Sequence, residues 1–138
     1  MTTPQTGADL MRLFVPNSPY VKHLGFELAE ISPGRAVLMA PFREELVTIG
    51  NVVHGGALAS LIDTTAMVAA WSDVEVSATP RGTTVGLNVS YLAAAGGEDL
   101  RAEAKVLHRG RSLVFVDVDV TTASGTPVAK GAVTYKID

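Results

Sequence analysis

Apolar and polar positions follow two different periods along this chain. Between residues 55 and 71 the sequence is rich in alanine, leucine and isoleucine, and apolar side chains recur every three to four residues on nearly every face. Such a pattern predicts one long helix that is buried on almost all sides. At 1.5 Å of rise per residue, this helix is expected to be about 25 Å long.

Before and after this helix the period falls to two, which is typical of strands with one buried face. Residues 43–53 are expected to form a loop that leads into the helix. This order predicts an α+β domain in which a curved antiparallel sheet wraps around one long central helix. The predicted strands, separated by turns that contain glycine, form a hairpin at residues 26–42 and four further strands at residues 83–92, 98–109, 111–122 and 126–137.

The first 17 residues are expected to lie outside the sheet. Residues 1–9 are polar and are predicted to form a mobile leader, and residues 10–14 carry a short helical stripe that Pro16 stops. Ser18 followed by Pro19 is typical of a helix start, so a second short helix is predicted there.

Composition limits the classes of protein to which this chain can belong. Of 138 residues, 47% are apolar and 18% charged, so a single folded domain over residues 1–138 is expected. The absence of cysteine excludes disulfides, thiolate metal sites and a cysteine nucleophile. A net charge of −3 does not favour a nucleic-acid partner. The N-terminal residues do not resemble a signal peptide, and no uninterrupted apolar run is long enough for a membrane span. A cytoplasmic protein is therefore expected.

One carboxylate, Asp63, stands inside the apolar helix. An ionised carboxylate in such surroundings is costly unless it is paired or partly solvated, and the helix offers no lysine or arginine within two turns of it. One interpretation is a structural tie to a neighbouring strand. The favoured interpretation is a nucleophile or general base held at the edge of a cleft.

His54, Gly55 and Gly56 begin the helix. A helix N-terminus presents unpaired N–H groups and a partial positive charge, and glycines allow another group to come close to the backbone. This arrangement suits an oxyanion site for a carbonyl under attack. On its own the triplet is more typical of an ordinary glycine-rich helix start, but Asp63, nine residues after His54, strengthens the functional interpretation.

The spacing of these two features predicts a dimer. Gly55 and Asp63 are eight residues apart, or about 12 Å along one helix axis. A carbonyl group has to contact the attacking group and the oxyanion donor at once, which one chain does not easily provide. Two antiparallel helices side by side would bring Gly55 of one chain to Asp63 of the other, so a two-fold dimer with two shared sites is expected.

The stretches HGGALASLID, GLNVSYL and HRGRSLVFVDVDV together resemble the PaaI-type acyl-CoA thioesterases of the hotdog-fold superfamily. The resemblance covers about residues 18–137, and its most specific part is His-Gly-Gly followed, after six intervening residues, by Asp. It implies the hotdog fold, hydrolysis of an acyl-CoA to free acid and CoA, and no metal or other cofactor. We expect homodimers with shared sites, paired into homotetramers.

The resemblance also implies roles for single residues. Gly55 would supply the oxyanion-hole amide, Asp63 the nucleophile or general base, and His54 would orient or polarise the thioester carbonyl. Thr84, on a strand beside the helix, would assist the carboxylate or the water. Relatives often carry Asn or Gln six residues before the His, where this chain has Thr48. Either Thr48 contacts the water or carbonyl, or Asn51, three residues before the His, takes over this role.

The sequence leaves alternatives open for two arginines, for the function as a whole and for five large apolar residues. Arg109 and Arg111 form either a solvated basic turn or a grip on the CoA phosphates. The rival functions are an acyl-thioester hydratase or dehydratase of the same fold, and a non-catalytic acyl-CoA-binding module. A further set of residues would either line an acyl tunnel or belong to the core, which is favoured for most of them: Met39, Phe42, Leu46, Met67 and Trp71.

Overall fold

The structure, a computed structural model, describes residues 4–138. Its helices are α1 (Gly7–Asn17), α2 (Pro19–Leu24) and α3 (Gly55–Trp71), and η1 (Glu44–Leu46) is a short 3-10 helix. Its strands are β1 (Glu27–Ser32), β2 (Arg35–Ala40), β3 (Val47–Ile49), β4 (Val52–Val53), β5 (Gly82–Tyr91), β6 (Leu100–Arg109), β7 (Leu113–Thr122) and β8 (Pro127–Ile137).

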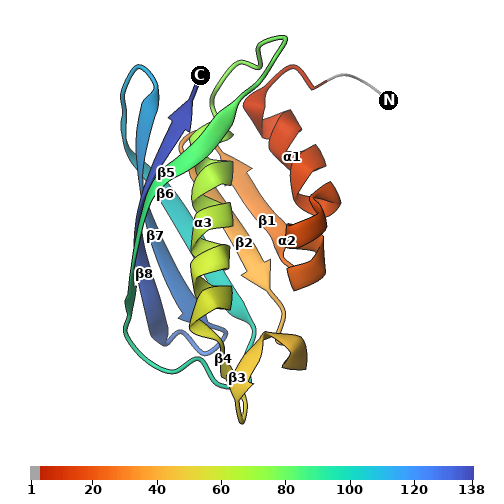
Figure 1. The fold of residues 1–138 in the computed structure, drawn as a ribbon, viewed down its shortest axis with the longest axis vertical. Coiled ribbons are helices and arrows are strands. Elements are labelled where there is room, and N and C mark those ends of the chain that lie inside the picture. Colours follow the sequence, from red (N-terminus) through yellow and green to blue (C-terminus); the bar gives the residue numbers. More distant parts are fainter. Residues whose placement is uncertain (1–3) are drawn as a thin grey trace.

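Six of the strands form one antiparallel sheet in the order β1-β2-β6-β7-β8-β5, and β3 pairs with β4 apart from it. The sheet curves around α3, while α1 and α2 lie beside α3 on the side of β1 (Figure 1). This confirms the predicted curved sheet around one central helix, with the predicted helix bounds. No helix among residues 4–138 is long and apolar enough to cross a membrane.

Close packing holds α3 against the sheet. Leu58, Leu61 and Ile62 of α3 are buried, as are the valines of β7 that face it. Gly131 of β8 makes the contact possible, because a Cβ at this position would overlap the Cγ2 methyl of Ile62. Burial of these side chains against one another supplies the main favourable free energy of folding.

Two segments differ from the prediction. Residues 43–53 are not a plain loop, because η1 and the hairpin of β3 and β4 lie within them; Gly50, with a φ of 59°, makes the tight turn of this hairpin. The first helix begins at Gly7, earlier than predicted, because the Thr6 side chain accepts a hydrogen bond from the Asp9 N–H and caps it. The prediction that Pro16 stops this helix is wrong, because Pro16 lies inside its last turn, one residue before the end at Asn17, where the missing N–H removes only one helical hydrogen bond. Residues 1–3 of the predicted leader lie outside the described residues.

The packing of Gly131 can be tested by adding one methyl group. We expect Gly131→Ala to lower the free energy of unfolding by about 1–3 kcal/mol, because the new Cβ forces Ile62 and α3 away from the sheet. Chemical denaturation measures this directly. Gly86→Ala is the matched control, since a Cβ there would lie 3.7 Å from the Thr134 Cβ, an ordinary contact. Equal stability of the two variants would contradict this role for Gly131.

Candidate active site

Asp63 lies on a partly exposed stripe of α3. This outer stripe comprises Gly56, Ser60, Asp63, Thr64 and Met67, which follow one another at helical spacings of three or four and are not fully buried. The remaining faces of α3 pack against the sheet and α1. The carboxylate therefore avoids the cost of complete burial, although the helix that carries it is apolar.

Thr84 of β5 holds the carboxylate. Its Oγ1 donates a hydrogen bond of 2.6 Å to Oδ1 of Asp63, a contact that fits both a structural tie to the strand and a hydroxyl that assists a catalytic carboxylate. Beneath the pair, Tyr135 of β8 stands opposite Thr84 in the strand register, and Trp71 Nε1 donates to its hydroxyl. Burial, and then the negative charge of Asp63, raise the pKa of Tyr135, so a neutral phenol lies near the carboxylate.

His54 caps the start of α3. Its Nδ1 accepts a 2.7 Å hydrogen bond from the Gly56 N–H, and its carbonyl accepts from Ala57 and Leu58. A neutral imidazole that accepts at Nδ1 carries its proton on Nε2, so His54 can donate only from Nε2. No acceptor for the Gly55 N–H is found among residues 4–138. Gly55 therefore presents an unpaired amide at the positive end of the helix.

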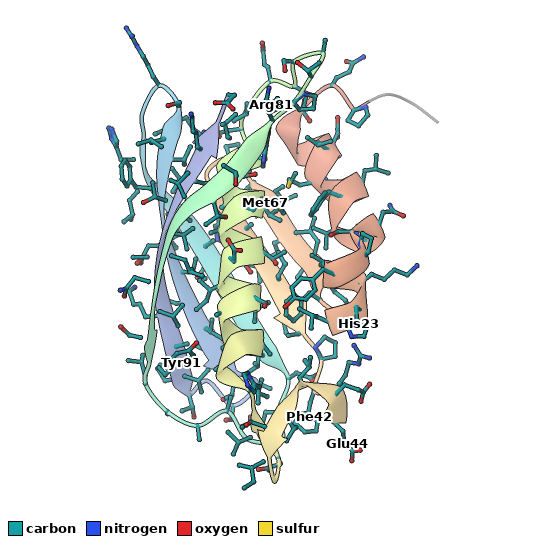
Figure 2. All side chains as sticks on the ribbon, viewed as in Figure 1. His23, Phe42, Glu44, Met67, Arg81 and Tyr91 are labelled. Carbon is teal, nitrogen blue, oxygen red and sulfur yellow. The ribbon has the colours of Figure 1, made fainter. Side chains whose placement is uncertain are left out.

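Tyr91, at the end of β5, is a site residue that the sequence interpretation did not identify. Its hydroxyl donates a 2.8 Å hydrogen bond to the Gly55 carbonyl, and its ring lies against the Gly55 backbone. Figure 2 labels Tyr91 near the end of α3 at which Gly55 lies, and Met67 farther along the helix. The alternation of Leu87, Val89 and Tyr91 was the available signal, since it places all three on one face of the strand.

A bulge in β5 brings Thr84 and Tyr91 to the same helix. The two residues are seven positions apart, and in a regular strand an odd spacing would put them on opposite faces. The register with β8 shifts between Thr84 and Gly86, which adds one residue at Val85 and restores a common face. β5 therefore contacts α3 through Asp63 near its middle and through Gly55 at its start.

Thr48 and Asn51 lie in different surroundings. Thr48, on β3, lines a cleft of about 350 Å³ together with Gly55, Leu58 and Tyr91. Asn51 occupies the β3–β4 turn and packs against Gly96 and Gly97, and its carbonyl accepts from the Gly97 N–H. Of the two candidates, Thr48 is the one that borders the cleft beside Gly55.

Arg109 and Arg111 lie at the other end of α3. One guanidinium nitrogen of Arg109, Nη2, donates to the Ala70 carbonyl and to the Asp73 carboxylate, so this side chain anchors the C-terminal end of the helix. Arg111 is exposed in the turn between β6 and β7. Both arginines line a cleft of about 260 Å³ that also includes Asp73 and Ser112.

Within one chain, Gly55 and Asp63 stay apart. Both lie on α3, eight positions apart, which is about 12 Å along the axis. The open amide and the carboxylate therefore belong to separate parts of the surface of one chain. Among the described residues, no group of three or more His, Cys, Asp or Glu side chains is arranged to hold a metal ion.

An antiparallel sheet wrapped around one long central helix is the hotdog fold. The thioesterase superfamily model matches residues 50–129. A protein of Halobacterium salinarum that is named as an esterase is 33% identical over 126 residues, covering 89% of this chain and 83% of that relative. Human acyl-coenzyme A thioesterase 13 is 32% identical over 109 residues, covering 75% of this chain and 74% of its own.

Two solved structures share the fold. The PaaI protein of Escherichia coli has a TM-score of 0.81 at 21% identity, covering 94% of this chain and 92% of its own. A hypothetical thioesterase from Streptococcus pneumoniae, solved with coenzyme A, has a TM-score of 0.73 at 23% identity, covering 83% of this chain and 86% of its own. The chain belongs to the thioesterase superfamily and is a thioester hydrolase, so the predicted resemblance and the predicted class of enzyme are confirmed.

The cap of α3 gives a stability prediction. We expect His54→Ala to lower the free energy of unfolding by about 1 kcal/mol, because the Gly56 N–H loses its acceptor. His54→Asn should retain most of the stability, since asparagine is a favourable N-cap residue. Thermal and chemical denaturation of the two variants measure the difference. Equal losses for both would show that the imidazole acts by some means other than capping.

Proposed function

We propose that the protein hydrolyses an acyl-CoA to the free acid and CoA, with Asp63 as the nucleophile or general base and the Gly55 amide as the oxyanion donor. The observation that supports this most strongly is the accessible Asp63 carboxylate, held by Thr84 on an otherwise apolar helix. The name of the human relative and the coenzyme A in the streptococcal structure support CoA as the carrier of the acyl group.

Two chains form each site in this proposal. β5 lies at an edge of the sheet, with β8 as its strand partner among the described residues. Four large apolar side chains at or just beyond this edge are between 43% and 56% exposed, namely Val85, Leu87, Tyr91 and Leu92. A free apolar edge strand is a ready surface for pairing with a second copy. A two-fold axis beside β5 would place two α3 helices antiparallel and bring Gly55 of one to Asp63 of the other.

The chemistry follows from this arrangement. The thioester carbonyl oxygen accepts a hydrogen bond from Gly55 N–H, which strengthens as negative charge develops on that oxygen. His54 directs its Nε2–H toward the carbonyl, and Thr84 fixes the carboxylate. Asp63 of the neighbouring chain either removes a proton from the attacking water or attacks the carbonyl carbon itself, followed by hydrolysis of the anhydride. In both routes the C–S bond breaks and the CoA thiolate leaves and takes up a proton.

The same two-fold arrangement supports a role for the arginines. An antiparallel partner would place the C-terminal end of its α3, with Arg109 and Arg111, beside the Gly55 end of the first chain. Arg111 is the more available of the two for CoA phosphates, because Nη2 of Arg109 already bonds to Ala70 and Asp73. Thr48, which borders the cleft at Gly55, is proposed to contact the water or the carbonyl. Dimers are proposed to pair into tetramers.

We expect Asp63→Asn to lower kcat for acyl-CoA hydrolysis by about a hundredfold to ten-thousandfold, because it removes the base or nucleophile while keeping the shape of the side chain. Thr84→Val, which removes only the hydrogen bond to Asp63, should cause a smaller loss of about tenfold. Steady-state kinetics on short, long and aromatic acyl-CoA thioesters measure both effects and the acyl preference.

Melting curves show whether each variant is folded. Full hydrolysis by a folded Asp63→Asn variant would contradict the assignment of Asp63. A wild-type protein that hydrates enoyl-CoA, or that binds acyl-CoA without turnover, would instead favour a hydratase or a binding module. Single-turnover hydrolysis in oxygen-18 water tests for the nucleophilic route, because the label enters the carboxylate of Asp63 only when water attacks the Asp63 carbonyl carbon of the anhydride.

A further inference from the structure

The peptide unit between Gly55 and Gly56 is held at both ends by side chains. Its carbonyl oxygen accepts from the Tyr91 hydroxyl at 2.8 Å, and its N–H donates to His54 Nδ1 at 2.7 Å. The two side chains come from different parts of the fold, one from the edge strand β5 and the other from the residue that begins α3. Together they define the orientation of this peptide plane.

Such a hold is needed because two successive glycines begin the helix. Glycine restricts its own backbone less than any other residue, so the first turn of α3 has little intrinsic stiffness. The Gly55 N–H belongs to the neighbouring peptide unit, and no acceptor for it lies among residues 4–138. The carbonyl of that unit, from His54, accepts from Ala57 and Leu58. The direction of the Gly55 N–H therefore depends on these bonds and on the backbone at Gly55, which joins it to the held peptide.

The Tyr91 ring adds a steric restraint. A Cβ at Gly55 would lie 3.3 Å from two ring carbons of Tyr91 and 3.4 Å from its hydroxyl oxygen. The ring therefore packs directly on the Gly55 backbone and closes one side of it. Tyr91 also lines the cleft that contains Thr48 and Leu58, so the restraint acts at the wall of the cleft beside the unpaired amide.

We propose that Tyr91 is a positioning residue, which clamps the Gly55–Gly56 peptide against His54 and thereby aims the Gly55 N–H at the substrate carbonyl. This proposal rests on the proposed hydrolysis. In it, the edge strand β5 influences catalysis through Tyr91. Tyr91 acts through the backbone of α3 and makes no bond to the reacting atoms.

The clamp can be measured without any substrate. Protein labelled with nitrogen-15 at glycine gives signals for at most 13 residues, so the Gly56 amide can be followed alone. We expect Tyr91→Phe, which keeps the ring, to speed hydrogen exchange of the Gly56 amide at least about threefold. Tyr20→Phe is the matched control, because the Tyr20 hydroxyl lies 2.9 Å from Ser60 Oγ, which donates to the Gly56 carbonyl and so touches the next peptide unit and not the one between Gly55 and Gly56. Unchanged exchange in Tyr91→Phe, or an equal change in the control, would overturn the clamp.

Kinetics then test whether the clamp serves the reaction. An oxyanion donor acts in the transition state, so Tyr91→Phe should lower kcat about tenfold with KM changed less than twofold, while Tyr20→Phe stays near the wild type. Faster exchange with an unchanged kcat would show that the clamp does not position the amide for catalysis. Failure of the proposed function is a separate result, since it appears as full activity of Asp63→Asn. In that case hydrogen exchange of the Gly56 amide still shows whether Tyr91 clamps the peptide.

Discussion

The structure depends on the burial of α3 against the curved sheet. This apolar, alanine-rich helix is stable here because the sheet and α1 cover most of it, and Gly131 lets β8 come close enough to contact Ile62. The one polar carboxylate must then lie on the part that the sheet leaves open. The packing that fixes α3 against the sheet therefore also fixes the direction in which the Asp63 side chain points.

β5 connects this buried helix to the rest of the site. The bulge at Val85 allows Thr84 to reach Asp63 and Tyr91 to reach Gly55, although an odd number of positions separates the two strand residues. The same strand presents a free apolar edge. In the proposed dimer, the strand that pairs with the second copy would thus also hold both reactive parts of α3. Assembly and the geometry of the site would then depend on one element.

Much of this arrangement could be predicted from sequence because it depends on periodicity. The apolar run of α3 and the alternation of the strands are strong local signals, and Thr84 was placed beside the helix by resemblance alone. That Tyr91 and Thr84 face the same helix could not be predicted in this way, because it depends on a one-residue bulge between them that alternation does not reveal. The β3–β4 hairpin was missed since its strands are only three and two residues long, and the choice between Thr48 and Asn51 required its turn geometry.

The central claim is that Gly55 and Asp63 act on one carbonyl from two different chains, and mixing two inactive variants tests it most directly. One is Asp63→Asn; the other is Gly55→Pro, which removes the N–H at the first helical position, where proline is tolerated and where the His54 ψ of 136° suits a following proline. The added Cβ meets the Tyr91 ring at 3.3 Å, so this ring has to shift by a few tenths of an ångström, and a melting curve shows whether the variant is folded. After refolding together, about half of the dimers are mixed, and each has one intact site of two. The mixture should regain about a quarter of the wild-type activity. Mixed dimers that form, as native mass spectrometry would show, but regain no activity beyond that of either variant alone would contradict the shared site.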